Sequence, residues 1–166
     1  QRVAIARALA VKPKFIIADE IVSALDATVK AQILNLMLKL QKIYRFSMLF
    51  ISHDLPITAY VSDVISVMYL GKIVETASSK ELLENPLHPY TVHLISSVPS
   101  LYVTTLGNSN NVKKVRLKGE IPSPINIPKG CRLHPRCPFA KDVCRNEEPP
   151  EVKVGNGHIV YCHLYA

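Results

Sequence analysis

Several features are missing from this sequence of 166 residues, and each absence limits what the chain can be. No apolar run approaches the roughly 20 residues needed to span a bilayer. The N-terminal stretch QRVAIARALA lacks the layout of a cleavable secretory signal. We therefore expect neither a membrane-spanning nor an exported chain, and any membrane association should come through a partner. A glycine-rich GxxxxGKS/T loop, which cradles phosphates in many nucleotide-binding proteins, is also missing.

Cysteine is absent from most of the chain. None occurs in the first 130 residues, and all four (Cys131, Cys137, Cys144 and Cys162) lie in the remainder. Seven of the twelve prolines also follow residue 101. A segment of this composition cannot fill a conventional core and needs cross-links, such as disulfides or a bound metal, to hold its fold. We therefore predict two regions, 1–100 and 101–166, joined through the polar linker 101–111.

Acidic residues are too few to balance the basic ones, and the net charge is +7. Residues 1–100 account for +2 and residues 101–166 for +5. A basic tail is compatible with nucleic acid or anionic lipid. No pattern of interleaved aromatic and basic residues accompanies it, and we interpret the tail as a solvated basic face without a nucleic-acid partner.

The hydrophobic content of 48% is enough for a real core, and its pattern predicts strands that alternate with helices. Apolar residues recur at three- and four-residue spacing over 27–45, which predicts a long amphipathic helix capped by Asp26. Short apolar runs on both sides of this helix predict buried strands that pair in parallel through it. The expected helices are 2–10, 27–45, a short helix that begins near Pro56, 79–84 and 90–97. The expected strands are 15–19, 48–52 and a hairpin of 64–70 and 72–76.

Polar side chains follow the first two expected strands at the point where each strand ends. The first strand, in FIIADE, ends in Asp19 and Glu20, and the second, in FISHDL, is followed by His53. Open α/β sheets place their ligands at this carboxyl edge. Two acids and a histidine there suit metal-assisted phosphoryl transfer, in which one carboxylate holds Mg²⁺ and another orients water. Taken alone, an apolar strand that ends in Asp-Glu is equally typical of a simple capped strand end.

The order of the motifs favours the chemical interpretation. FIIADE resembles the Walker B strand of the nucleotide-binding subunits of ABC transporters, and His53 resembles their switch histidine. The SALD segment that follows resembles their D-loop, and it comprises Ser23, Ala24, Leu25 and Asp26. QRVAIARALA is similar to the helix that follows their LSGGQ signature. DVISVMYLGKIVE, NPLHPYT and the cysteine tail are similar to the oligopeptide/dipeptide importer branch, so the resemblance covers nearly the whole chain.

This resemblance implies a fold and a set of roles. The fold would be α/β: the C-terminal part of a P-loop-type ABC ATPase core, with parallel strands, crossover helices and a hairpin, plus a small loop-rich extension that contains the cysteines. The cofactors would be ATP and Mg²⁺. Asp19 would act on Mg²⁺, Glu20 would polarise the attacking water as general base, and His53 would contact the γ-phosphate. The SALD residues would pass across a dimer interface.

The same resemblance implies partners and a location. A second ABC ATPase subunit, identical or different, would complete the dimer beneath membrane permease subunits. A peptide-binding protein would be an indirect partner. The chain would then lie peripherally at the cytoplasmic face of the cell membrane and help to drive peptide import.

Two departures from the family pattern affect these expectations. Ile21 and Val22 stand where the family usually has Pro-Thr, which loosens a fixed φ and removes a hydroxyl. No glycine-rich loop, Q-loop or LSGGQ precedes Gln1. Backbone amides and a lysine on the phosphates supply most of the affinity in such sites. We therefore expect this polypeptide by itself neither to bind ATP tightly nor to hydrolyse it.

The cysteines follow the spacing C-x5-C-x6-C-x17-C, which predicts a shared ligand in the tail. The closely paired C-x2-C knuckles of zinc sites are missing. Pro138, directly after a cysteine, suits a [4Fe–4S] cluster at least as well, and some members of the importer branch hold such a cluster. Zinc, disulfides and unpaired thiols remain alternatives. Four thiolates already complete a tetrahedron, so we expect the nearby His134, His158 and His163 to be surface or packing histidines.

Two other classes of function stay open. A soluble ABC-type ATPase of DNA repair could place a metal module and the basic tail on DNA, although no heptads of the kind found in its coiled coils occur here. Salt-dependent DNA binding by residues 101–166 would favour that class. A non-enzymatic metal-binding fragment is the third class, and ATP binding distinguishes it from the first.

Overall fold

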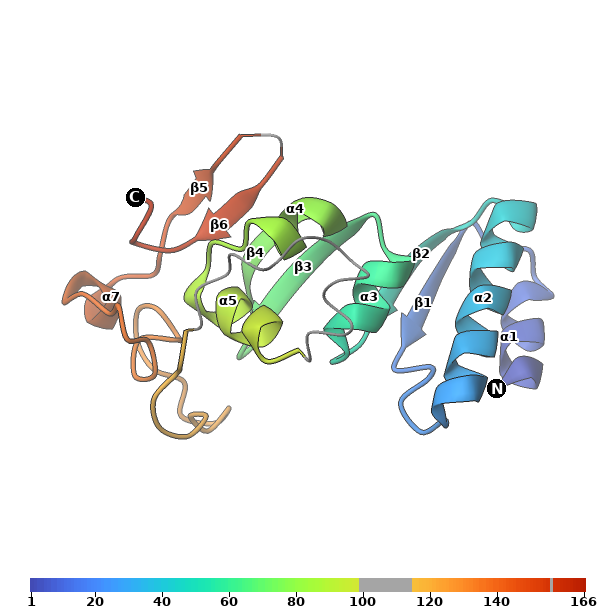
Figure 1. Ribbon diagram of the computed structural model, residues 1–166, viewed down its shortest axis with the longest axis horizontal. Coiled ribbons are helices and arrows are strands. Elements are labelled where there is room, and N and C mark those ends of the chain that lie inside the picture. Colours follow the sequence, from blue (N-terminus) through green and yellow to red (C-terminus); the bar gives the residue numbers. More distant parts are fainter. Residues whose placement is uncertain (99–114, 156) are drawn as a thin grey trace. The chain divides into compact units, whose positions relative to one another are not determined.

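The computed structural model describes residues 1–98, 115–155 and 157–166 (Figure 1). It is a mixed α/β structure that divides into two compact units, Gln1–Ser62 and Asp63–Ala166. No helix in the described part of the chain is both long and apolar enough to cross a bilayer. The linker predicted at 101–111 lies outside the described residues, so the regional boundary predicted there stays a prediction.

The first unit is a two-stranded parallel sheet with helices. Its elements are α1 Arg2–Leu9, β1 Phe15–Asp19, α2 Ala27–Tyr44, β2 Ser47–Ile51 and α3 Leu55–Val61. The two strands pair in parallel with Phe15 opposite Ser47 and Asp19 opposite Ile51, and α2 is the crossover between them (Figure 1). The predicted parallel pairing is therefore confirmed. It brings the carboxyl ends of both strands to the same edge of the sheet.

The long helix α2 begins and ends for identifiable reasons. The Asp26 carboxylate accepts hydrogen bonds from the backbone N–H groups of Thr28 (3.1 Å) and Val29 (3.0 Å), which confirms the predicted cap. At the other end, Arg45 adopts a left-handed conformation with φ of 54°. The chain then turns directly into β2, so this helix fixes the spacing between the two strands.

The core of the first unit lies between helices α1 and α2 and one face of the sheet. The buried side chains are Ile5, Val22, Ile33, Leu34, Met37 and Phe46, and the partly buried strand residues Ile16, Met48 and Phe50 pack against them. The predicted amphipathic pattern of α2 is confirmed, because its buried positions fall at three- and four-residue spacing.

The other face of this sheet is apolar and exposed. Phe15 and Ile17 of β1 are 55% and 62% exposed, and Leu49 and Ile51 of β2 are 47% and 43% exposed. Successive side chains of a strand alternate between faces, so these four residues share one face. The prediction of buried strands is therefore correct for one face only. Parallel sheets are normally covered on both faces, whereas this one has only one covered face.

The second unit contains a four-stranded antiparallel sheet in the order β3-β4-β6-β5. Its elements are β3 Val64–Tyr69, β4 Lys72–Ser78, α4 Ser79–Glu84, α5 Pro89–Ser96, α7 Val143–Asn146, β5 Glu151–Lys153 and β6 Ile159–Tyr161. The β3–β4 hairpin turns at Gly71, as predicted, with φ of 78°. Strand β6 pairs with β4 through Glu75 and Val160 (Figure 1). The C-terminal strands thus extend the sheet of the hairpin, an arrangement that the sequence did not predict.

Candidate functional site

Glu20 lies directly after β1, where the backbone leaves the strand. Its N–H donates to the Ile51 carbonyl oxygen of β2 at 3.0 Å, which extends the ladder between the strands by one bond. Its φ is 45°, in the left-handed region that residues other than glycine rarely adopt. Strained backbone of this kind clusters at functional sites. The conformation of Glu20 is therefore consistent with a functional side chain at this edge.

His53 follows β2 and reaches the Glu20 side chain. Its Nδ1 lies 3.1 Å from Glu20 Oε1, although 33 residues separate the two in sequence. A carboxylate only accepts hydrogen bonds, so Nδ1 carries the proton in this contact. Both side chains remain accessible, with 75% of His53 and 52% of Glu20 exposed. The structure thus brings together the two residues predicted to be catalytic.

Asp19 is the last residue of β1 and is exposed at the same edge. Within the described ranges its carboxylate has no hydrogen bond or ion pair to the protein. A solvent-facing carboxylate without a protein partner is chemically suited to a hard cation such as Mg²⁺. The structure therefore leaves this side chain available for the metal role predicted from the sequence.

The segment predicted to be a D-loop begins with a tight turn on Glu20. The N–H and Oγ–H of Ser23 both donate to the Glu20 carbonyl oxygen, at 3.1 and 3.0 Å. Val22 is only 3% exposed and belongs to the core of the unit. Ala24 is exposed, Leu25 is partly buried, and Asp26 caps α2. Val22 therefore anchors the loop by packing at one of the two positions where the sequence departs from Pro-Thr.

The four cysteines are all free thiols of the second unit. Cys131 and Cys144 are neighbours through the backbone, because the Cys131 N–H donates to the Cys144 carbonyl oxygen at 2.9 Å. Gly130 makes this approach possible. A Cβ at Gly130 would lie 2.6 Å from the Cys144 carbonyl oxygen, and its φ is 65°. Only glycine fits there without displacing α7, so the glycine positions two of the thiols.

The environment of the thiols combines burial with backbone donors. Burial raises the pKa of Cys162 to about 11, and the other three thiols lie near enough to add to the rise. Burial also raises the pKa values of Cys131 and Cys137. Each of these three thiols meets a backbone N–H two residues further on, from Leu133, Phe139 or Leu164, which favours the thiolate. Four neighbouring thiols, two buried and two partly buried, with amide donors form a candidate ligand set for a metal centre.

Spacing sets a limit on this interpretation. Among the described residues, no group of three or more His, Cys, Asp or Glu side chains is placed to hold one metal ion. Thiolates that share one zinc ion at about 2.3 Å each lie within roughly 4 Å of one another. The thiols therefore gather without forming a ready single-ion site. The nearby histidines have other partners: His134 contacts the Cys131 carbonyl oxygen, and His163 contacts that of Glu147.

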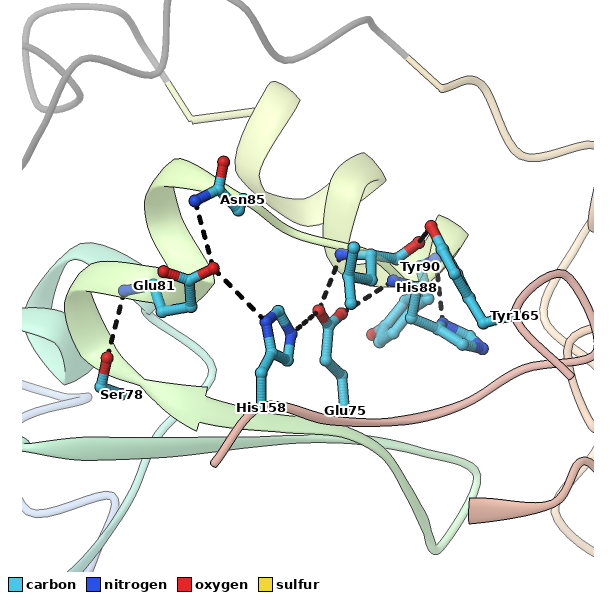
Figure 2. A network of polar contacts seen from close by, with 9 residues as sticks. Glu75, Ser78, Glu81, Asn85, His88, Tyr90, His158 and Tyr165 are labelled. Atoms are coloured by element: carbon cyan, nitrogen blue, oxygen red, sulfur yellow. Dashed lines mark hydrogen bonds and ion pairs between the residues drawn. The ribbon is translucent and has the colours of Figure 1, made fainter. Parts of the chain in front are cut away.

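A buried polar network in the second unit was missed by sequence reasoning (Figure 2). Glu75 of β4 is fully buried, and its carboxylate accepts hydrogen bonds from the backbone N–H groups of Leu87 (2.7 Å) and His88 (2.9 Å). His158 Nε2 lies 2.7 Å from the same carboxylate. Figure 2 shows Glu81 of α4 on the other side of the His158 ring, at 3.7 Å from Nδ1. The network therefore ties β4, the start of α5 and the C-terminal segment together.

The chain is similar to peptide-transport ATP-binding proteins over its whole length. A family model described as "Oligopeptide/dipeptide transporter, C-terminal region" matches residues 74–144. The oligopeptide transport ATP-binding protein AppF of Bacillus subtilis is 51% identical over 166 residues, all of this chain and 50% of the relative. The probable peptide ABC transporter ATP-binding protein y4tS of Sinorhizobium fredii is 49% identical over all of this chain and 46% of its own length. The dipeptide transport ATP-binding protein DppF of Haemophilus influenzae is 44% identical over 98% of this chain and 48% of its own length.

Proposed function

The chain belongs to the family of oligopeptide/dipeptide transport ATP-binding proteins, and we propose that it forms the C-terminal half of such an ATPase. It spans about half the length of the curated relatives that it matches. In this proposal the chain contributes metal, water and switch residues to a site for ATP hydrolysis. The observation that carries it is the 3.1 Å contact between Glu20 and His53 at the carboxyl ends of two parallel strands.

The geometry allows Glu20 to act as general base. Nδ1–H of His53 holds Oε1 of the carboxylate in one orientation, while Oε2 has no protein partner in the described part of the chain. Oε2 can therefore accept the proton of a water molecule that attacks the γ-phosphate. His53 would act mainly as a positioning residue. Contact of its other ring nitrogen with the γ-phosphate would require a proton on that nitrogen as well.

Asp19 completes the arrangement at the same edge. Its exposed carboxylate would hold Mg²⁺ directly or through a water, and the bound ion would neutralise charge that develops on the phosphates. The Ser23–Glu20 turn would present the SALD segment to a second ATPase subunit. Little covalent work is needed in phosphoryl transfer, so positioning by these side chains is the main contribution of this half.

The rest of the ATPase would cover the exposed face of the β1–β2 sheet. The four apolar residues on that face need burial, and the longer relatives have about as much chain again from which to supply it. A glycine-rich loop and further strands would enter there, and the phosphate cradle would come with them. The proposed partners are a second ATPase subunit and membrane permease subunits at the cytoplasmic face of the membrane.

ATP binding tests this proposal. We expect the chain alone to retain no ATP in equilibrium dialysis at micromolar concentrations, because the phosphate cradle supplies most of the affinity. Joined to the N-terminal half of the Bacillus subtilis relative, it should bind ATP with Mg²⁺ at least about 100-fold more tightly. A circular dichroism spectrum controls for folding of the joined protein. If the chain alone and the joined protein bound ATP with equal affinity, the proposal would be rejected.

We further propose that the four cysteines hold a [4Fe–4S] cluster. The four thiols lie near one another, two are buried and two partly buried, and they receive backbone amide donors. A [4Fe–4S] cluster takes four cysteine thiolates, which is the number that this segment supplies. The centre would be structural, because this loop-rich segment buries little apolar surface of its own. Binding would require release of the thiol protons, whose pKa values burial raises.

Metal analysis after anaerobic purification tests the cluster. We expect about four iron and four sulfide per chain. We also expect absorption at about 400 nm, which arises from charge transfer between thiolate and iron. Cys162→Ser should lose most of the iron, whereas Ser123→Ala, an exposed change in the same unit, should keep it. A colourless protein with one equivalent of zinc would refute the cluster.

A further inference from the structure

A cavity of about 480 Å³ lies in the second unit, at the end of the β3–β4 hairpin and beside the segment that carries Cys131. Its volume falls within the range of small-molecule sites, which are mostly apolar with a few placed polar groups. The apolar part of its lining consists of Met68, Ile73, Val74, Leu133, Pro149 and Tyr161. Cys131, proposed above as a cluster ligand, lies on one side of it, but Asp19, Glu20 and His53 do not line it, so the proposed ATPase chemistry leaves this cavity unexplained.

The charged side chains that line the cavity are not balanced. Lys72 pairs with Glu148 at 3.1 Å, which leaves Arg132 as the cation without an acidic partner. The Arg132 guanidinium donates through one nitrogen to the Leu70 carbonyl oxygen. Its other donors have no protein acceptor among the residues that the structure describes. A guanidinium has five N–H groups in a planar fork that matches a carboxylate, so several remain for a ligand.

His88 adds a buried donor to the same lining. It is 1% exposed, and burial lowers its pKa to about 4, so the ring is neutral at pH 7. Nδ1 accepts a hydrogen bond from the Tyr90 backbone N–H at 3.2 Å (Figure 2), which places the proton on Nε2. No hydrogen bond from Nε2–H is found within the described ranges, and this atom is not fully buried, since it is not among the buried side-chain atoms without a partner. Because His88 lines the cavity, Nε2–H can donate to an acceptor atom of a ligand there.

We propose that this cavity binds a small molecule that carries one carboxylate on an apolar body. The carboxylate would pair with the free donors of Arg132, and the apolar body would lie along Met68, Ile73 and Leu133. Lys72 and Glu148 neutralise each other, so Arg132 leaves the cavity with a net positive charge. This charge disfavours the binding of amines. The neutral Nε2–H of His88 would donate to a ligand oxygen, which adds a directional contact inside the apolar lining.

Calorimetric titration of the full chain with three matched probes tests this assignment. 4-Phenylbutyrate carries the carboxylate, 4-phenylbutylamine carries a cation, and 4-phenylbutyramide is neutral. We expect 4-phenylbutyrate to bind at least about tenfold more tightly than the other two. The amine and the amide cannot form the charge-assisted bidentate pair with Arg132 that the carboxylate forms. Tighter binding of the amine or the amide would overturn the proposed ligand class, and absence of binding by all three would overturn the site.

Variants locate the binding. Arg132→Gln should weaken 4-phenylbutyrate about tenfold or more, whereas Arg145→Gln, an exposed arginine outside the lining, should change it less than twofold. Ile73→Trp should abolish binding, because the larger side chain fills the cavity from a position that is 43% exposed and tolerant of size. Circular dichroism checks that each variant is folded. Unchanged affinity in a folded Ile73→Trp protein would show that the ligand binds elsewhere.

Discussion

Replacement of Glu20 by glutamine in the joined ATPase should lower ATP turnover by at least about 100-fold, the usual contribution of a general base. The amide is close in shape to the carboxylate and can still meet His53, so the edge of the sheet should keep its geometry. It cannot accept a proton from water at neutral pH. ATP binding should therefore be retained while hydrolysis is lost, and the two measurements together identify a chemical role.

A matched control separates this effect from a general loss of charge. Glu120→Gln removes an exposed carboxylate of the second unit and should leave turnover within twofold of the parent protein. His53→Ala removes the side chain that orients Glu20 and should also lower turnover, since the carboxylate loses its one donor among the described residues. Turnover in Glu20→Gln that equals the parent value would reject Glu20 as the base and, with it, the proposed mechanism.

The fold of the first unit was largely predictable because local patterns determine it. The apolar spacing of α2 and the Asp26 cap are properties of consecutive residues, and the crossover follows from the strand–helix–strand order. The exposed face of the β1–β2 sheet was not predictable in the same way. FIIAD reads as a buried strand, and which of its faces is covered depends on structure beyond the strand itself.

The candidate site was predictable to the extent that strand ends position it. Glu20 and His53 meet because parallel pairing aligns the ends of β1 and β2. The positive φ of Glu20 and the core packing of Val22 carry no clear signal in the sequence. The Glu75 network was also missed, because 83 residues separate Glu75 from His158 and only the pairing of β4 with β6 brings them together. The acidic residue Glu75 in the middle of the strand KIVETAS was the available hint.

That network leads to the second large effect, on stability. Glu75 is fully buried, and its carboxylate satisfies two backbone N–H groups and the His158 ring. Each of these donors would lose its acceptor in Glu75→Ala, and a cavity would remain. Removing one member of a buried, hydrogen-bonded charged pair typically lowers the free energy of unfolding by about 3–5 kcal/mol. We expect a loss of that size in the free energy of unfolding of the second unit.

The Tyr69 and Tyr90 rings, which pack in a tilted arrangement with centroids 4.7 Å apart, provide a local signal for this measurement. Urea unfolding followed by near-ultraviolet circular dichroism should show a midpoint about 1–5 M lower in Glu75→Ala, given slopes of about 1–3 kcal/mol/M. Glu75→Gln should fall between the two proteins, because the amide keeps one acceptor oxygen but turns an NH₂ group toward a donor.

An exposed carboxylate of the same sheet supplies the matched control. Glu151 of β5 accepts from the Tyr161 hydroxyl at 2.9 Å and pairs with Lys153, but it is solvent-accessible. Glu151→Ala should cost less than about 1 kcal/mol, because water replaces the lost partners at the surface. If Glu75→Ala cost no more than Glu151→Ala, the buried carboxylate would not be what holds the C-terminal segment to the hairpin. A large difference would instead show that one side chain joins β4, α5 and the cysteine-bearing tail into a single cooperative unit.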